Sequence, residues 1–303
     1  MTISSSLRKK ACANLTPYYF ILPSFIIYAV FILIPILDTL RLSFFEWSGF
    51  SAARFIGFEN YRNLLVDQVF WQALLNNVKF IIFYTFLPVL LGLLLTLLIA
   101  RRQFIGRSFF RVGLFISYVM PMVVVGVVWR WMYNPIFGPI NTFLRSVGLK
   151  SLAIGWLGDF HWAFIAIGLI ATWALYPYCM TLFIAGVQRI DGTLYDAARV
   201  DGANDWQQML HVTIPGIRAE ILVAIITTFI AALRSFDLVF VTTRGGPAQQ
   251  TIVSSLLLYL NAFQINRVGY AASIAVVQTV LILIISYLLL SRNQKESGES
   301  QKI

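Results

Sequence analysis

Apolar residues gather in six stretches along the chain, and each stretch has the length of a helix that crosses a lipid bilayer. A bilayer core about 30 Å thick requires roughly 20 apolar residues in a helix. The stretches do not alternate between apolar and polar positions as barrel strands do. The pattern therefore predicts an all-α integral membrane protein with six transmembrane helices, at Tyr18–Leu37, Phe80–Ala100, Val112–Trp129, Trp162–Gln188, Ile221–Val241 and Val268–Ser291.

The composition agrees with a membrane protein and excludes several other classes. Hydrophobic residues make up 59% of the 303 residues and charged residues only 12%, whereas about a quarter of the residues in a soluble protein are charged. These values exclude a soluble enzyme and a disordered chain. The two cysteines, Cys12 and Cys179, are too few for a disulfide scaffold. The net charge of +10 does not indicate nucleic-acid binding, because membrane proteins concentrate Lys and Arg on one side of the bilayer.

The distribution of Lys and Arg predicts the orientation of the chain. Basic residues are about twice as dense in the two tails and in the second and fourth connections as in the others, which marks the cytoplasmic side. We therefore expect cytoplasmic tails at residues 1–17 and 292–303, on either side of one membrane domain, residues 18–291. The first stretch should remain as a span and not be a cleaved signal peptide, because Pro23 and Pro35 interrupt it and no small-x-small cleavage site follows.

The connection after the first span contains a short amphipathic pattern. Apolar residues recur at helical spacing among polar ones near Tyr61–Gln72. We expect a helix that lies at the membrane surface, and a docking surface for an external partner is the alternative.

The fourth connection, residues 190–215, is longer than two packed helices need. Its side chains predict two short helices joined by a turn. Thr193 can cap the first helix, and Asn204 or Asp205 can cap the second. Gly202 suits the left-handed turn between them, and Pro215 suits the start of the next span. We expect a rigid helix-turn-helix that projects into the cytoplasm.

The same connection carries a recognisable motif. Asp196-Ala197-Ala198 is followed by Gly202 and, nine residues later, by Val212-Thr213-Ile214-Pro215. This resembles the coupling loop of permease subunits in ATP-binding-cassette (ABC) importers, written E-A-A, three residues, G, nine residues, I-x-L-P. The chain departs from it with Asp196 in place of Glu, Val212 in place of Ile and Ile214 in place of Leu.

Three further segments resemble signatures of the sugar-permease branch, which includes the membrane subunits of maltose and glycerol-phosphate transport. They are Phe55–Tyr61, Gly138–Asn141, and Thr243–Pro247 followed by Thr251. Four motifs in the right order cover almost the whole chain. The resemblance implies a type I ABC importer permease fold in the inner membrane of a bacterium.

The resemblance also implies a function and a set of partners. A binding protein outside the membrane would deliver a sugar or sugar-like solute, and a second permease subunit would complete the pathway. Two copies of an ATPase would grip the coupling loops. This chain has no Gly-x4-Gly-Lys-Ser/Thr phosphate loop, so it is not expected to be an enzyme, and ATP and Mg would be bound by the ATPase. The implied ATPase contacts are Tyr195, Asp196, Ala197, Ala198, Gly202 and Pro215.

A substrate site is expected near the middle of the fourth and fifth spans. Aligning Gly202 and Pro215 with the family motif places the contacting positions of relatives at Tyr178, Thr228, Ala232 and Ser235. Trp173 and Tyr176 lie beside Tyr178, and aromatic rings can stack on the C–H face of a sugar. Ordinary packing of aromatic and small residues is the alternative. Oligosaccharides, disaccharides, glycosides of glycerol and glycerol phosphate all remain open as substrates.

Arg234 and Asp237 are the only charges inside a predicted span. At a spacing of three residues on one helix they can pair. A structural ion pair, or a contact to the partner permease, is the expected role, whereas an ion-coupled secondary transporter or channel would use the pair for coupling. His161 and His211 have no metal-ligand spacing, and no pair of catalytic groups supports a membrane enzyme.

Overall fold

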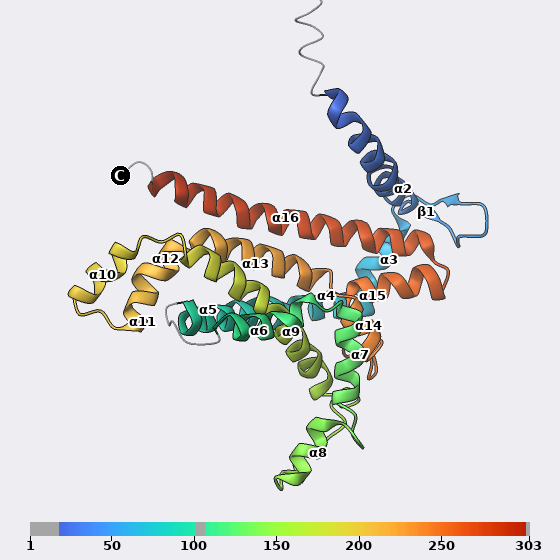
Figure 1. The fold of residues 1–303 in the computed structure, drawn as a ribbon. Helices are drawn as coiled ribbons and strands as arrows, with labels where there is room; N and C mark the ends of the chain where they lie inside the picture. Colours follow the sequence, from blue (N-terminus) through green and yellow to red (C-terminus); the bar gives the residue numbers. More distant parts are fainter. Residues whose placement is uncertain (1–17, 101–106, 301–303) are drawn as a thin grey trace, which may run out of the picture. The chain divides into compact units, whose positions relative to one another are not determined.

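The computed structural model describes residues 18–100 and 107–300, which are mostly helical (Figure 1). The predicted tail at residues 1–17 lies outside the described residues, as do Arg101 and Arg102. The chain divides into two compact units. Unit 1 comprises residues up to 66 together with 261–277, and unit 2 comprises residues 67–260 and those from 278 onward.

Unit 1 contains the first long helix, which runs over Tyr18–Leu42. A π-helical turn, η1 (Ala29–Leu33), precedes its last part, α2 (Ile34–Leu42). Two short antiparallel strands follow, β1 (Phe45–Glu46) and β2 (Arg54–Phe55), with Phe45 opposite Phe55. Next comes α3 (Glu59–Val66), whose buried Asn60 donates hydrogen bonds to the carbonyls of Ser43 and Phe45. The unit closes with part of η5 (Leu260–Gln264) and the first turns of α16 (Val268–Ser300).

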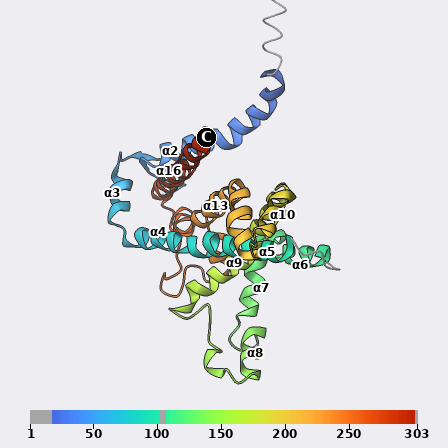
Figure 2. The same cartoon turned by 90° about the vertical axis from the view of Figure 1, so that its left-hand side faces the viewer.

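Unit 2 is organised around α9 (Trp162–Val187), in which 72% of the most apolar 18-residue window is buried. A continuous helix packs on α9, formed by α4 (Gln68–Ile81), η2 (Ile82–Phe86) and α5 (Leu87–Ala100) (Figure 2). Glycines make the close approach between them. A Cβ on Gly92 would lie 2.8 Å from the Cβ of Cys179, and one on Gly168 would lie 2.3 Å from the Phe83 ring. Close helix packing through small residues is typical of membrane proteins.

The remaining helices of unit 2 surround this pair. They are α6 (Arg107–Val119), α7 (Met122–Met132), α8 (Pro139–Ser146), η3 (Lys150–Leu152), α10 (Gly192–Val200), α11 (Asp205–Gln208), η4 (Met209–Thr213), α12 (Ile214–Gly216), α13 (Arg218–Leu233), α14 (Asp237–Thr242), α15 (Ser254–Tyr259) and the second part of α16. Figure 1 shows α10 and α11 at one end of the helices of this unit and α7 and α8 toward the other.

Four helices among the described residues are long and apolar enough to cross a membrane. They are Tyr18–Leu42, Gln68–Ile99, Trp162–Val187 and Val268–Ser291, which correspond to the first, second, fourth and sixth predicted spans. Two bent helix pairs raise the number to six if each is counted as one span. One pair bends by 104° between Val119 and Met122, at Pro121, inside the third predicted span. The other bends by 74° before Arg218.

The fifth predicted span, Ile221–Val241, is not one helix. The α13 helix ends at Leu233 and α14 begins at Asp237. Arg234 and Asp237 therefore lie at the ends of two helices, and no ion pair among the described residues joins them. The prediction that they pair on one helix is wrong, because the helix ends between them.

The predicted amphipathic helix at Tyr61–Gln72 is also wrong as a single element. The α3 helix ends at Val66, and α4 begins at Gln68. Asp67 between them has extended backbone, and its carboxylate accepts the N–H groups of Val69 and Phe70. A side chain that caps a new helix in this way interrupts the old one.

Candidate functional site

The fourth connection folds as the sequence predicts, into two short helices joined by a turn. The first helix, α10, and the second, α11, flank Gly202, whose backbone adopts φ +78°. A side chain is strained in this left-handed conformation, whereas glycine is not. Asn204 caps α11, because its side chain accepts the N–H of Gln207 while the Gln207 side chain accepts the N–H of Asn204. We call residues 190–215 the coupling loop, after the motif that they resemble.

The cap of the first helix lies two residues earlier than predicted. The α10 helix begins at Gly192, and the carboxylate of Asp191 accepts the N–H of Thr193 over 3.0 Å. Thr193 is therefore inside the helix and is not its cap. Asp191 takes this role because its extended backbone directly precedes the first helical residue. The backbone hydrogen bond from Thr193 lowers the pKa of the Asp191 carboxyl below its usual value.

The residues that correspond to the family motif lie along α10. Asp196 and Ala197 are exposed, whereas Tyr195 and Ala198 are half-buried. The carboxylate of Asp196 accepts a hydrogen bond from Arg199, one helical turn later, over 2.9 Å. The exposed face of α10 can meet a partner surface closely, because two small alanines leave room there.

Apolar side chains that the motif does not include are exposed on the same two helices. Leu194, Val200 and Trp206 are 54%, 87% and 53% exposed. Exposed apolar side chains of this size, outside the membrane spans, can be covered by a partner protein. These residues were visible in the sequence as apolar positions outside any span, and that signal would have identified them.

A groove borders the turn between the two helices. It is lined by Ala198, Asp201, Gly202, Ala203, Gln207, Gln208, His211 and Val212. The His211 Nδ1 atom lies 2.9 Å from the carbonyl of Gln207. The groove and the exposed face of α10 together give the coupling loop two surfaces for a partner.

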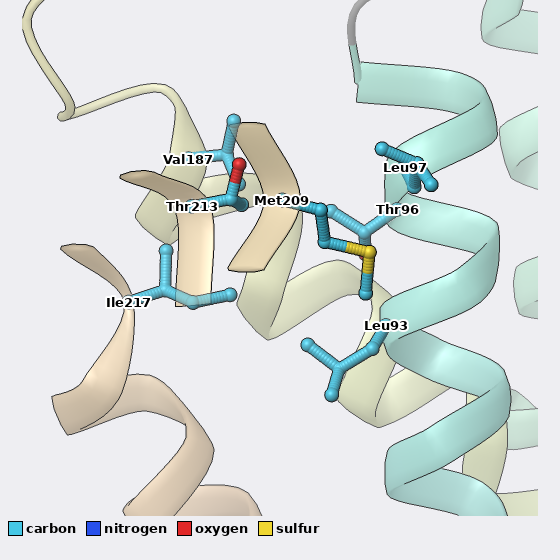
Figure 3. A pocket seen from close by; sticks show the side chains of 7 residues that line it. All are labelled: Leu93, Thr96, Leu97, Val187, Met209, Thr213 and Ile217. Carbon is cyan, nitrogen blue, oxygen red and sulfur yellow. The ribbon is translucent and has the colours of Figure 1, made fainter. Parts of the chain in front are cut away.

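The coupling loop is anchored on the helices of unit 2 through its second half. Met209 is 4% exposed, and its side chain extends toward Leu93 and Thr96 of α5 (Figure 3). Val187 and Thr213 line the same small apolar pocket on its other side (Figure 3). The residues that line this pocket come from η4, α5 and α9, so η4 lies against both of these helices.

The two halves of the loop are also joined to each other. The Tyr195 hydroxyl of α10 lies 3.1 Å from the Thr213 hydroxyl. Pro215 lies in α12, and a Cβ on the adjacent Gly216 would lie 2.5 Å from a side-chain carbon of Ile190. Tyr195, one of the predicted ATPase contacts, is therefore a position where the loop closes on itself, and Pro215 directly precedes another at Gly216.

The predicted substrate residues fall into two groups. Tyr178 is half-buried, and its ring stacks on Tyr118 of α6 with centroids 5.3 Å apart. Its hydroxyl lies 3.2 Å from that of Thr227. Trp173 packs edge-to-face on Trp129 of α7, and Tyr176 lies half-buried on the same helix.

The second group is buried and lies apart from these contacts. Thr228, Ala232 and Ser235 are at most 6% exposed. The Thr228 hydroxyl donates to the carbonyl of Ala224 in its own helix. Ser235 lies beyond the end of α13, so the three residues do not form one helix face. The structure brings Thr227, and not Thr228, to Tyr178.

One buried amide holds the break between α13 and α14. The side chain of Asn77 donates to the carbonyls of Ala232 and Leu233, each over 3.1 Å. Its oxygen accepts the backbone N–H and the hydroxyl of Ser254, over 2.9 and 2.5 Å. Backbone carbonyls at a helix end inside a membrane protein need such partners.

Two of the sequence signatures stabilise turns. The Thr251 hydroxyl donates to the carbonyl of Gly246 and lies 2.7 Å from the Thr243 hydroxyl. In the other signature, Asn141 donates to the carbonyl of Ile154 and accepts the indole N–H of Trp156, both over 2.8 Å. Among the described residues, no group of three His, Cys, Asp or Glu side chains has the arrangement of a metal site.

Comparison with known proteins places this arrangement in a family. Residues 89–295 match the family described as binding-protein-dependent transport system inner membrane component. The probable ABC transporter permease protein YurN of Bacillus subtilis is 36% identical over 275 residues, which are 90% of this chain and 94% of that protein. The lactose transport system permease protein LacF of Rhizobium radiobacter is 32% identical over 290 residues, covering 95% and 96%.

A solved structure has the same fold. A chain of a bacterial alginate ABC transporter, crystallised in complex with an alginate pentasaccharide-bound periplasmic protein, matches with a TM-score of 0.80. The match covers 93% of this chain and 94% of that chain at 21% identity.

Proposed function

The chain belongs to the family of binding-protein-dependent transport system inner membrane components, and from this premise we propose that it is a permease subunit of an ABC importer for a sugar. It is a transport subunit and not an enzyme. The observation that carries the proposal is the coupling loop, a closed helix-turn-helix with an exposed face that is anchored on α5 and α9.

The proposed mechanism follows from these contacts. A separate ATPase would hold ATP and Mg and would grip the loop at Tyr195, Asp196, Ala197, Ala198 and Gly202. Closure of the ATPase would pull on α10, and Met209 would pass the movement to α5 and α9. The transmembrane helices would then open alternately to the two sides of the membrane.

A sugar is the solute that fits both the relatives and the aromatic residues. The relative LacF is named for lactose transport. In this chain, the Tyr118 and Tyr178 rings can stack on the C–H face of a pyranose, and the Thr227 hydroxyl can bond to a sugar hydroxyl. Tyr118 is 41% exposed, which supports its access to a solute. We propose this group as the membrane substrate site.

The other partners follow from the same proposal. We propose that an extracytoplasmic binding protein delivers the sugar and that a second permease subunit completes the pathway. Six spans would place both termini and the coupling loop in the cytoplasm of a bacterium, and the chain would be a multi-pass protein of its inner membrane.

The competing hypothesis, an ion-coupled transporter, relied on Arg234 and Asp237. These residues lie at the ends of separate helices and are not joined by an ion pair. This arrangement does not favour their use as an ion couple.

Two glycines of the coupling loop allow a matched test. A Cβ would meet nothing within 4 Å at either Gly192 or Gly202, but only Gly202 has a positive φ. We expect the complete transporter with Gly202→Ala to lose most ATP-driven uptake of radiolabelled sugars in proteoliposomes, and Gly192→Ala to retain it. Uptake by this chain without an ATPase, or full uptake by Gly202→Ala, would contradict the proposal.

A further inference from the structure

A buried carboxylate lies at the base of the coupling loop, outside the family motif. Glu220 is in the first turn of α13 and is only 7% exposed. It forms an ion pair with Arg189, which follows the end of α9. The chain leaves the membrane helices at Arg189 and returns to them at Glu220, so the pair joins the two ends of the loop.

The helix ends favour this pairing. The carboxyl end of a helix carries a partial negative charge and the amino end a partial positive charge. Arg189 lies at the carboxyl end of α9 and Glu220 near the amino end of α13. Each side chain therefore has the charge that its own helix end attracts, and the two helix ends are held together by the pair.

Close packing surrounds the carboxylate. A Cβ on Gly186 of α9 would lie 2.9 Å from the Glu220 side chain and 3.0 Å from Ile217. Gly186 therefore makes the space that Glu220 occupies against α9. A carboxylate in such a place is unfavourable unless it is paired, and removal of its partner leaves an uncompensated charge.

We propose that the Arg189–Glu220 pair couples ATP hydrolysis to transport by fixing the base of the coupling loop, so that α9 and α13 move together with it. Met209 transmits movement to α5 and α9. The Arg189–Glu220 pair also transmits it to α13, whose carboxyl end is bound by Asn77. Arg189 and Glu220 are positioning residues, and neither contacts the sugar or ATP. The inference rests on the proposed function.

The test compares single and paired substitutions in the complete transporter, reconstituted with its ATPase and binding protein. The readout is the number of sugar molecules imported per ATP hydrolysed. Arg189→Gln and Glu220→Gln should each lower this ratio by at least about fivefold, while the complex still assembles. The charge swap, Arg189→Glu with Glu220→Arg, should restore much of it. Gln188→Ala, beside Arg189, is the control and should keep the wild-type ratio.

A second variant covers the case in which a single substitution prevents assembly. Cysteines at positions 189 and 220, in a chain with Cys12→Ser and Cys179→Ala, can be joined by a short bis-methanethiosulfonate reagent, which forms a disulfide with each thiol and releases two methanesulfinate ions. The cross-linked transporter should import more sugar per ATP than the same protein without the reagent. Unchanged ratios in the single variants, or equal ratios with and without the cross-link, would overturn the inference. A wild type without ATP-driven sugar uptake would instead overturn the proposed function and this inference with it.

Discussion

The Arg199 guanidinium donates a hydrogen bond to the Asp196 carboxylate over 2.9 Å, and both side chains are exposed on α10. Asp196 occupies the position of the acid in the family motif, which is expected to bind a basic partner. Arg199 therefore competes with that partner for the Asp196 carboxylate. An exposed ion pair at this spacing contributes about 1 kcal/mol or less, so a basic residue of the ATPase can displace Arg199 from the Asp196 carboxylate.

This competition gives a prediction for ATPase docking. Arg199→Gln should strengthen ATPase association by up to about fivefold, because it releases the carboxylate, and Asp196→Asn should weaken it by about fivefold. The measurement is titration of the purified ATPase onto the permease in nanodiscs. Asp205→Asn removes an exposed acid from α11 and should have little effect. Both differences should shrink at high salt. Weaker association of Arg199→Gln would refute the competition.

The stability of unit 2 should depend on Asn77. In Asn77→Leu, the carbonyl of Ala232 and the N–H of Ser254 lose their side-chain partner. Each buried group left without a partner costs about 1–3 kcal/mol, so the midpoint of thermal unfolding in detergent should fall by about 10 °C. Asn63→Leu changes an exposed asparagine of α3 and should shift the midpoint by less than about 2 °C. Equal midpoints for the two variants would contradict this role.

Transport should depend on the ring of Tyr178 more than on its hydroxyl. Tyr178→Phe retains the stack on Tyr118, whereas Tyr178→Ala removes it. Because an aromatic contact contributes about 0.5–1.5 kcal/mol, the uptake rate at saturating loaded binding protein should fall about tenfold in Tyr178→Ala. It should stay within about threefold of the wild type in Tyr178→Phe. Tyr287→Ala, which removes an exposed ring from α16, is the control. Equal losses in all three variants would argue against the aromatic site.

The first helix of the coupling loop should depend on pH through Asp191. Because the folded state lowers the pKa of this carboxyl, its cap stabilises α10 fully above the unfolded pKa of about 4. The stabilisation is lost as the pH falls through the lower, folded-state pKa. Hydrogen exchange, corrected for intrinsic rates, should show reduced protection of residues 192–200 in strong acid. Asp191→Asn can cap the helix without titrating, so this variant should lack the additional loss of protection in acid. The same loss in Asp191→Asn would refute the role of Asp191.

Local rules were sufficient for the turn of the coupling loop and for the region of its second cap. Gly202 could be assigned to the turn, and the cap to Asn204 or Asp205, because both roles depend on a few adjacent residues. The same rules misplaced the first cap by two residues, since Asp191 and Thr193 can both accept the hydrogen bond and only backbone conformation decides between them.

The broken helices could not be predicted in this way. The run at Ile221–Val241 is apolar except at Ser, Thr and the two charges Arg234 and Asp237, and it contains no glycine or proline. Its break into two helices is stabilised by Asn77, a residue far away in the sequence. The pairing of Arg189 with Glu220 is equally non-local, because it depends on the packing of Gly186 against α13. The stacking of Tyr118 on Tyr178 also joins two spans whose contact no sequence pattern reveals.

The contacts of Asn77 also set an order for the biogenesis of the protein. Its partners lie 155–177 residues later in the chain, and the neighbouring Asn76 bonds to carbonyls equally distant. During synthesis, both amides reach the bilayer long before these partners leave the ribosome. Polar groups in hydrocarbon seek any available partner, so the newly inserted α4 must be shielded by water or by the insertion machinery until Ser254 has emerged. A chain truncated before that residue would expose two unsatisfied amides, which gives membrane quality control a direct means of recognising it.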